Sequence, residues 1–141
     1  MKEKSLIILK PDCMEKKLMP EVLKRFFNAG LDICACKMAK LGADILAEHY
    51  AHIADKPYYP PLAAFMGRRP VIILVLEGEG AVAKVRKLIG PTNSEAAAAG
   101  TIRGDFGDNT RENIVHASDS PENAEIEINR FFAPNEVFSI S

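Results

Sequence analysis

One histidine in this chain stands where side-chain chemistry could occur. His116 is one of three histidines, and it lies in the segment Asn113–Ser120, at the expected end of a short strand and just before a helix. Helix starts carry free backbone N–H groups and the positive end of a dipole, which favour bound anions. His49 and His52 lie inside an expected helix, where packing or surface roles are the better interpretation. Taken alone, His116 is better interpreted as a structural histidine.

Three positively charged side chains could bind such an anion. Lys10 ends the first expected strand on the same face as Leu6 and Ile8, so its ammonium group could reach a cleft or turn toward solvent. Arg86 flanks the apolar stripe of an expected helix, and Arg103 lies in a glycine-rich segment whose flexible backbone suits a phosphate clamp. Each position is a weak indication by itself, because most surface lysines and arginines are only solvated.

Several familiar motifs are missing from the sequence. It has no Gly-x-x-x-x-Gly-Lys-Ser/Thr loop, no Gly-x-Gly-x-x-Gly after a strand and no Gly-x-Ser-x-Gly elbow. Cys34 and Cys36 would share one face of a strand, where burial as small residues is a better interpretation than a metal or redox pair. With Cys13 they make an odd count of three, which argues against a disulfide framework, and no spacing completes a zinc site.

The expected elements follow from apolar runs, periodicity and punctuation by glycine and proline. Strands are expected at residues 6–9, 31–41, 71–76 and 113–117, with turns at residues 10–12 and 77–80. Helices are expected over residues 20–30, 46–53 and 82–89 and after residue 120, and residues 91–113 are expected to form a long loop. This order predicts an α+β sandwich of ferredoxin-like type, with a mainly antiparallel sheet covered by helices.

Composition limits the class of protein. A chain of 141 residues that is 48% hydrophobic fits one compact domain, residues 1–141, with a substantial core. A formal net charge of -1 gives no broad basic field, so no stable nucleic-acid partner is expected. No apolar run is long enough to span a membrane and no signal peptide is evident, so we expect no membrane partner and a cytoplasmic location.

Taken together, these segments resemble the nucleoside diphosphate kinase family along almost the whole chain. The matching segments are Ile8–Asp12, Glu48–Tyr50, Lys56–Tyr59, Val85–Asn93, Gly100–Phe106 and Asn113–Ser120, the last around the phosphorylated histidine of the family. The resemblance implies transfer of the terminal phosphate of a nucleoside triphosphate, typically ATP, to a nucleoside diphosphate, by a ping-pong reaction through a phosphohistidine at His116. Phosphoryl transfer needs mainly positioning and charge stabilisation, and a neutral imidazole can attack near neutral pH.

The resemblance also implies roles for single residues. Helical geometry alone does not distinguish Glu127 from Glu125. The resemblance selects Glu127, which is expected to hold the imidazole nitrogen of His116 that does not take the phosphate. Ser118 is expected to support that carboxylate or the histidine, and Lys10 is counted with the catalytic residues. Phosphate and sugar binding is expected from Lys10, Tyr50, Arg86, Thr92, Arg103 and Asn113, and base binding from Tyr58 and Leu62. Mg²⁺ is expected to arrive on the nucleotide phosphates, with no direct protein ligand.

The sequence departs from the family at a few positions. Ala117 stands where glycine is usual, and Thr110 where an apolar residue commonly clamps the base. Ser94 and Ala99 replace two prolines of a loop that helps to assemble subunits. We expect a homo-oligomer, a tetramer or a hexamer, because the strands are more apolar than one helix layer can cover. The alternative is a non-catalytic nucleotide- or RNA-binding module of the same fold, although a binder has little need of His116 beside an orienting carboxylate.

Overall fold

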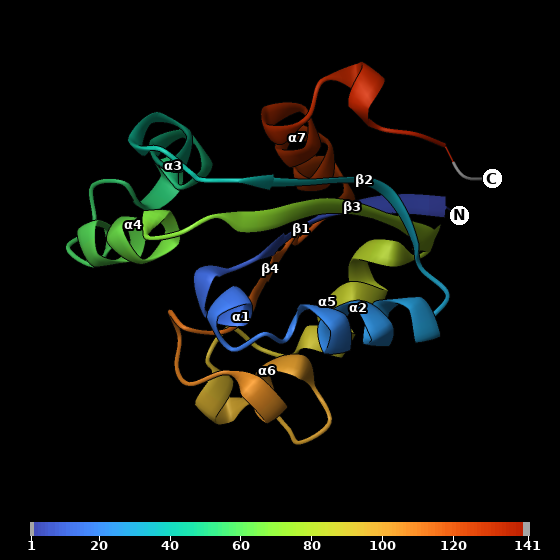
Figure 1. Cartoon of the computed structure of the whole chain (residues 1–141), viewed down its shortest axis with the longest axis horizontal. Coiled ribbons are helices and arrows are strands. Elements are labelled where there is room, and N and C mark those ends of the chain that lie inside the picture. The colour runs from blue at the N-terminus through green and yellow to red at the C-terminus, as the bar shows by residue number, and fades with distance from the viewer. Residues whose placement is uncertain (1, 140–141) are drawn as a thin grey trace.

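A four-stranded antiparallel sheet forms the centre of the molecule. The structure is a computed structural model that describes residues 2–139 (Figure 1). The strands are β1 (Lys2–Leu9), β2 (Asp32–Ala39), β3 (Val71–Glu79) and β4 (Val115–Ala117), in the spatial order β2-β3-β1-β4. Each pair of neighbours is antiparallel. The predicted α+β fold of ferredoxin-like type is confirmed.

Helices connect the strands. They are α1 (Pro11–Glu15), α2 (Met19–Asn28), α3 (Ala43–His49), α4 (Tyr59–Gly67), α5 (Ala81–Ile89), α6 (Ile102–Phe106) and α7 (Pro121–Phe131), with 3₁₀ turns at Ala51–Ile53, Ser94–Ala96 and Pro134–Glu136. As the sequence predicts, α7 begins after Ser120, whose hydroxyl accepts the backbone N–H of Asn123, with Pro121 in the first turn. Within residues 2–139, no helix combines the length and apolar character needed to cross a bilayer.

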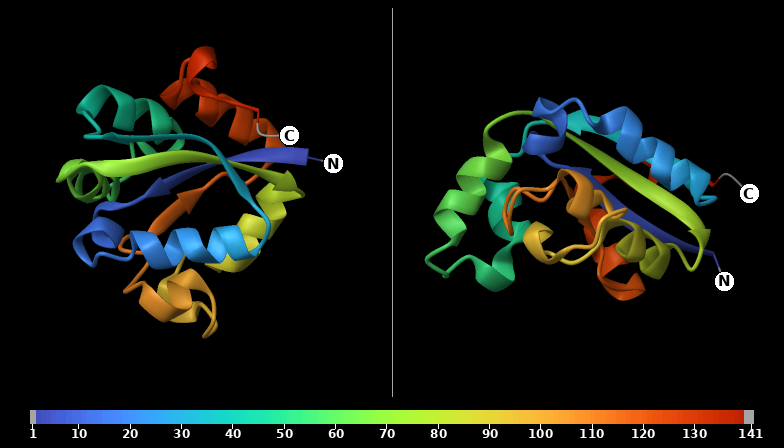
Figure 2. Two further views of the ribbon diagram at one scale, coloured as in Figure 1. Left: turned by 45° about the vertical axis from the view of Figure 1, so that its right-hand side comes forward. Right: turned by 90° about the horizontal axis from the view of Figure 1, so that it is seen from below.

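Helices cover both faces of the sheet, and each face has its own hydrophobic core (Figure 2). In β1, Ile7 belongs to a core with α2 and α5, whereas Ile8 belongs to a core with α3, α4 and α7. This alternation is the period-two pattern of a strand buried on both sides. The argument for an oligomer from strands too apolar for one helix layer therefore does not hold, because α2 and α5 cover the face opposite α7.

The sheet register decides where His116 points. His116 lies opposite Ile8 in the β1–β4 ladder, so its side chain leaves the sheet on the face that α7 covers. Its strand neighbours Val115 and Ala117 are buried in the other core. A shift of one residue would bury His116 beneath α2 and α5, so the register is a condition for the site.

Several expected boundaries are corrected by the structure. The predicted turn at residues 10–12 opens α1 instead, because proline is well suited to the first turn of a helix. The predicted turn at residues 77–80 is mostly strand, and only Gly80, with φ of 56°, leaves β3. The long loop at residues 91–113 contains α6, and of the strand expected at residues 113–117 only the last three residues pair with β1.

A bulge in β2 separates the two neighbouring cysteines. The register between β2 and β3 shifts between Ile33 and Ala35, so the alternation of faces is broken at this point. Cys34 is consequently buried beside Ala35, whereas Cys36 is exposed. The expectation that the two cysteines share one buried face was therefore wrong.

Gly104 offers a test of how tightly the loop before β4 is packed. A β-carbon added to Gly104 would lie 2.0 Å from the carbonyl oxygen of Ala98. Because that oxygen belongs to the backbone, it cannot move aside as the end of a flexible side chain could. We expect Gly104→Ala to lower the free energy of unfolding by about 1–3 kcal/mol, as overpacking does, and to lower the melting temperature in calorimetry. Gly42→Ser is the matched control, because its β-carbon meets nothing within 4 Å at the N-cap of α3. Equal melting temperatures for the two variants would contradict this packing.

Candidate active site

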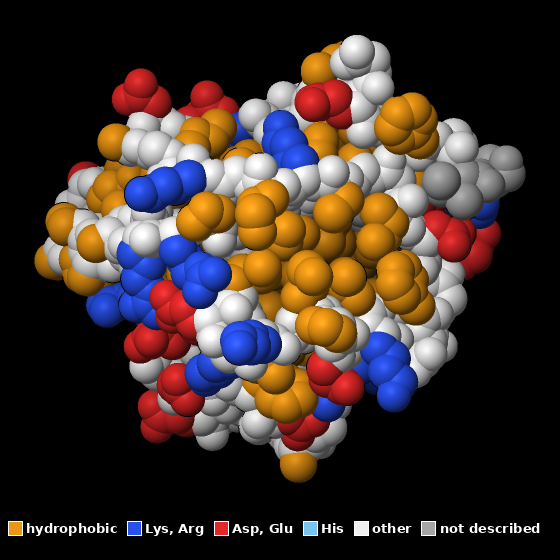
Figure 3. Space-filling model, viewed as in Figure 1, with side chains coloured by type: hydrophobic (Ala, Val, Ile, Leu, Met, Phe, Trp, Pro, Cys, Tyr) orange, Lys and Arg blue, Asp and Glu red, His pale blue; other side chains and the backbone are white. Residues whose placement is uncertain are grey.

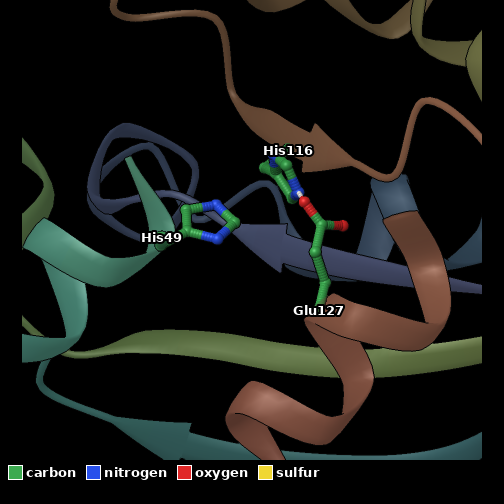
Figure 4. A group of neighbouring side chains, drawn as sticks. All are labelled: His49, His116 and Glu127. Atoms are coloured by element: carbon green, nitrogen blue, oxygen red, sulfur yellow. Dashed lines mark hydrogen bonds and ion pairs between the residues drawn. The ribbon is translucent and has the colours of Figure 1, made fainter. Parts of the chain in front are cut away.

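The centre of the site is a chain of three hydrogen-bonding side chains that begins at His116. Nε2 of His116 lies 3.1 Å from Oε2 of Glu127 on α7 (Figure 4). The Ser118 hydroxyl donates to Oε1 of the same carboxylate at 2.6 Å and accepts the backbone N–H of Leu6 at 2.9 Å. The carboxylate is thus held at both oxygens, one by the histidine and one by a serine anchored to β1.

This geometry fixes the tautomer of His116. An ionised carboxylate only accepts hydrogen bonds, so Nε2 carries the proton and Nδ1 of the neutral ring keeps the lone pair. Burial of Glu127 opposes ionisation, but the hydrogen bonds and charge supplied by His116, together with Ser118, lower the pKa of this carboxyl below its ordinary value. The arrangement suits a nucleophilic Nδ1 whose ring can tolerate a developing positive charge.

Lys10 follows β1 and faces the same pocket. Its Nζ donates to Oδ1 of Asn113 at 2.6 Å, and the side-chain amide of Asn113 donates in turn to the carbonyl oxygens of Thr92 and Thr110. Burial and, after it, the charge of Arg103 lower the pKa of Lys10 to about 7. The protein therefore holds a lysine that is easily discharged until an anion arrives.

Arg103 is buried and holds the backbone around the site by hydrogen bonds. Its guanidinium donates to the carbonyl oxygens of Asn113 at 3.2 Å, Gly90 at 3.1 Å and Val115 at 2.7 Å. Burial and the nearby charge of Arg86 lower the pKa of Arg103 to about 10, so it remains charged at neutral pH. Three of its five N–H groups are engaged with carbonyls, which leaves two for a ligand.

The backbone is strained at Ile114, next to the carbonyl groups that Arg103 binds. Ile114 has φ of 76°, which is costly for a β-branched side chain. Its backbone N–H donates to Oδ2 of Asp12 at 3.0 Å, and its carbonyl oxygen accepts from the N–H of Lys10 at 2.9 Å. Both neighbours of Ile114 are held by Arg103, so the fold imposes this conformation just before β4 begins.

A pocket of about 840 Å³ joins these groups. Among the residues singled out from the sequence, the pocket is lined by Lys10, Tyr50, Tyr58, Leu62, Arg86, Thr92, Arg103, Asn113, His116 and Glu127. Ser118 is completely buried behind Glu127 and does not line it. Residues from seven separate segments of the sequence are thus brought to one cavity.

Sequence reasoning missed His49 as a site residue. His49 was assigned a packing or surface role, yet it lines the pocket, and its ring centroid lies 4.7 Å from that of His116. Arg130, also missed, donates to Nδ1 of His49 at 2.8 Å. Only the proximity of His49 to Tyr50 in the sequence hinted at this position, and Arg130 carried no signal because its partner is 81 residues away.

Three departures from the family pattern have clear structural settings. Ala117 belongs to the core beneath α2 and α5 and also lines the pocket, where its carbonyl oxygen accepts from Arg86 at 3.4 Å. Thr110 lines the pocket, and its carbonyl oxygen holds the Asn113 amide. Ser94 is buried close to Gly107, where an added β-carbon would meet its Oγ at 2.0 Å.

His49, His116 and Glu127 are also the group that comes nearest to a metal site among the described residues. One potential ligand atom from each lies within 4.8 Å of the others. Glu127 already accepts from His116 and Ser118, however, and His49 accepts from Arg130, so Nδ1 of His116 is the ring nitrogen that keeps a free lone pair. The guanidinium charge of Arg130 also opposes a cation at this place.

Both the sequence and the fold of this chain match known proteins. Residues 3–137 match the family described as nucleoside diphosphate kinase. A nucleoside diphosphate kinase of Parabacteroides distasonis is 48% identical over 136 residues, which are 96% of this chain and 89% of that protein. One of Methanocaldococcus jannaschii is 46% identical over 138 residues, covering 98% of this chain and 99% of that protein.

Solved structures agree with the sequence matches. The nucleoside diphosphate kinase of Aquifex aeolicus superposes with a TM-score of 0.93 at 42% identity, over 97% of this chain and 99% of that one. The enzyme of Halobacterium salinarum, solved in complex with CDP, gives a TM-score of 0.96 at 34% identity, over 100% of this chain and 94% of that one.

The lowered pKa of Lys10 predicts a pH dependence for anion binding. Inorganic triphosphate should raise the pKa of Lys10 on binding, so that binding takes up a proton above pH of about 7. We therefore expect affinity to fall as pH rises through 7 and beyond, by at most about tenfold per pH unit because one proton is involved. Isothermal titration calorimetry in buffers of different ionisation enthalpy measures this uptake. Lys10→Met should lose it, and an equal uptake in this variant would contradict the assignment.

Proposed function

The chain belongs to the nucleoside diphosphate kinase family, and we propose that its phosphotransfer runs through His116. As a member of this family it is an enzyme that moves the terminal phosphate of a nucleoside triphosphate to a nucleoside diphosphate. The observation that carries the proposal is the Nε2 bond from His116 to Glu127, which leaves the Nδ1 lone pair unprotonated in a pocket lined by cations. This combination supports covalent catalysis by the imidazole.

In the first half-reaction, the Nδ1 lone pair of His116 attacks the terminal phosphorus. The bond from phosphorus to the bridging oxygen breaks, and its electron pair leaves with the nucleoside diphosphate. The ring gains positive charge as the new nitrogen–phosphorus bond forms, and the carboxylate of Glu127 stabilises that charge through Nε2. In the second half-reaction, a terminal oxygen of another nucleoside diphosphate attacks the same phosphorus and restores neutral His116. Two half-reactions let one site serve unlike nucleotides.

The cations of the pocket support binding of the phosphates. We assign the phosphate and sugar contacts to Lys10, Tyr50, Arg86, Thr92, Arg103 and Asn113. Lys10 and Arg103 are almost completely buried, so their charges act in a medium where water screens them little. Buried cations that only carbonyl and amide oxygens satisfy are well suited to a polyanion that supplies the missing charge.

We propose that Mg²⁺ is held through the nucleotide phosphates. The pocket has two acidic residues, Asp119 and Glu127. Both oxygens of Glu127 are engaged, and Oδ1 of Asp119 accepts from Asn123 at 2.6 Å, so no carboxylate cage is available. These residues fit a cation that keeps most of its waters. When bound, Mg²⁺ would supply charge neutralisation between the phosphates.

We propose that the base lies at the outer end of the pocket, between Tyr58 and Leu62 on one side and Thr110 on the other. Tyr58 is 52% exposed and lines the pocket at the start of α4, where its ring can cover a planar base. The relative from Halobacterium salinarum was solved in complex with CDP, and we propose that this chain also accepts cytidine nucleotides. Stacking reads no base edge, which is consistent with broad base acceptance.

A non-catalytic nucleotide- or RNA-binding module was the alternative. The relatives that cover nearly the whole chain are nucleoside diphosphate kinases, and nothing in the site favours a binder. A binder gains nothing from a serine-anchored carboxylate aimed at a histidine. We further propose that residues 1–141 act as one domain, and that the enzyme works in the cytoplasm, where the thiols of Cys13, Cys34 and Cys36 stay reduced.

We also propose that the chain forms a homo-oligomer, either a tetramer or a hexamer. Figure 3 shows a broad hydrophobic patch on the face where β2 and α2 lie in Figure 1. Phe27 on α2 is 49% exposed and Met38 on β2 is 59% exposed. β2 is an edge strand with no strand partner on its outer side within residues 2–139, although its Cys34 carbonyl oxygen accepts from the backbone N–H of Phe138 at 2.8 Å. Exposed apolar area beside an open edge favours a protein partner, here another copy of the chain.

A labelling experiment tests the role of His116. The pure protein incubated with γ-³²P-ATP and magnesium, without an acceptor, should retain label that acid releases and base preserves. UDP should then remove the label as UTP. We expect His116→Ala to lose the label while nucleotide binding and the circular dichroism spectrum stay near those of the wild type. Full labelling or turnover in His116→Ala would overturn the mechanism.

Sedimentation velocity tests the assembly proposal. The wild type should sediment as an oligomer at micromolar concentration. Met38→Glu places a charge in the exposed patch and should shift the chain toward smaller species. Ala83→Glu is the matched control, because Ala83 is an exposed residue of α5 and lies outside both β2 and α2. A monomeric wild type, or equal behaviour of the two variants, would contradict an interface at β2 and α2.

A further inference from the structure

His49 is a second imidazole enclosed beside the reacting histidine. It is 5% exposed at the end of α3, and its ring meets His116 edge-on at 4.7 Å between centroids with 77° between the planes. Tyr50 and Phe131 pack edge-on against its other sides, at 4.8 and 5.3 Å. Figure 4 shows His49 reaching from α3 toward the space between His116 and Glu127. The mechanism described above makes no use of this ring.

Arg130 determines the protonation of His49. The guanidinium of Arg130 approaches Nδ1 of His49 at 2.8 Å and is itself held by Glu48 at 2.9 Å. A guanidinium has N–H groups and no lone pair, so Nδ1 must accept and the proton of neutral His49 must be on Nε2. Nε2 is buried and has no hydrogen-bond partner among the described residues. The single lone pair of the neutral ring is therefore taken up by Arg130.

Without Arg130, the lone pair of His49 could compete with Glu127 as a hydrogen-bond acceptor for His116. A ring nitrogen of His49, a ring nitrogen of His116 and a carboxylate oxygen of Glu127 all lie within 4.8 Å of one another. If the His49 lone pair were free, a small rotation of either ring would let it accept the Nε2–H of His116 in place of Glu127. A neutral acceptor stabilises a positive ring less than a carboxylate does.

We propose that Arg130 is a positioning residue that acts through His49: by occupying the His49 lone pair, it leaves Glu127 as the only acceptor for the Nε2 proton of His116. This inference rests on the proposed function, because it matters only if His116 takes the phosphoryl group. Its consequence is that the ring of His116 stays directed by a carboxylate throughout the transfer, so that charge on the ring is compensated as the nitrogen–phosphorus bond forms.

The charges around His49 agree with this role. The groups that face it are His116 on β4 and Glu127 and Arg130 on α7, with Glu48 and His52 on its own segment. Burial first, and then the electrostatic interaction with His116, lower the pKa of His49 to about 3, so His49 stays neutral at every pH at which the enzyme would work. A cationic His49 would compete with His116 for Glu127, and Arg130 opposes that state.

Nuclear magnetic resonance can read the tautomer without any nucleotide. The chain has three histidines, so long-range ¹H–¹⁵N spectra of ¹⁵N-histidine-labelled protein can be assigned with one substitution per ring. In the wild type, His49 should show a protonated Nε2 and an unprotonated Nδ1. In Arg130→Met, the two forms should interconvert or the proton should move to Nδ1. A wild-type His49 with its proton on Nδ1 would overturn the proposal, whatever the variants do.

Kinetics then separates a positioning role from a structural one. In single-turnover phosphorylation by ATP, Arg130→Met should lower the limiting rate by about ten- to a hundredfold, the effect of losing a hydrogen bond to a charged group. The ATP concentration for half-maximal rate should change by less than about twofold. Arg130→Lys keeps a charged donor and should restore most of the rate. Arg68→Met is the control, since it removes the exposed ion pair with Glu15 outside the pocket.

A double-mutant comparison tests the route through His49. His49→Phe keeps an aromatic ring but has no lone pair, so adding Arg130→Met to it should cause no further loss of rate. Equal losses in both backgrounds, a rise in the half-maximal ATP concentration without a change in limiting rate, or no effect at all would each overturn the proposal. If Arg130→Met does not fold, Arg130→Leu replaces it. A wild type that never forms the phosphoenzyme would instead refute the proposed function, while the tautomer result would still stand.

Discussion

The site depends on one guanidinium buried among carbonyl oxygens. Arg103 bonds to the carbonyls of Gly90, Asn113 and Val115, so a single planar group ties the end of α5 to the start of β4. Carbonyl dipoles satisfy its hydrogen bonds but do not cancel its charge. With Lys10 buried nearby and partly discharged as a result, the pocket has excess positive potential on rigid supports. An anion entering it meets preformed donors and causes little reorganisation.

The two imidazoles of the site acquire opposite characters from their partners. His116 donates to a carboxylate and keeps a lone pair, whereas His49 accepts from a guanidinium and keeps a proton. Neither assignment follows from the ring itself, since a neutral imidazole can carry its proton on either nitrogen. α7 provides both partners, because Glu127 and Arg130 are three residues apart on one side of the helix. The position of a single helix over the sheet therefore sets two tautomers.

Much of this architecture could be predicted from local sequence. The buried strands, the capped start of α7 and the pocket-lining residues drawn from the family motifs all lie where expected. The errors arose where distant contacts override local pattern. The bulge between Ile33 and Ala35 depends on pairing with β3, and the length of β3 depends on its full ladder with β1. His49 and Arg130 are ordinary helix residues until the fold joins them.

The strand that carries His116 is only three residues long and lies at an edge of the sheet. Its position is set largely by side chains from elsewhere, namely Asp12 on Ile114 and Arg103 on the flanking carbonyls. Hydrogen bonds from Arg103, in the segment at residues 91–113, therefore fix the backbone that carries His116. A change that broke these bonds would loosen β4 and redirect the His116 ring, while the long ladders that join β1, β2 and β3 would stay paired.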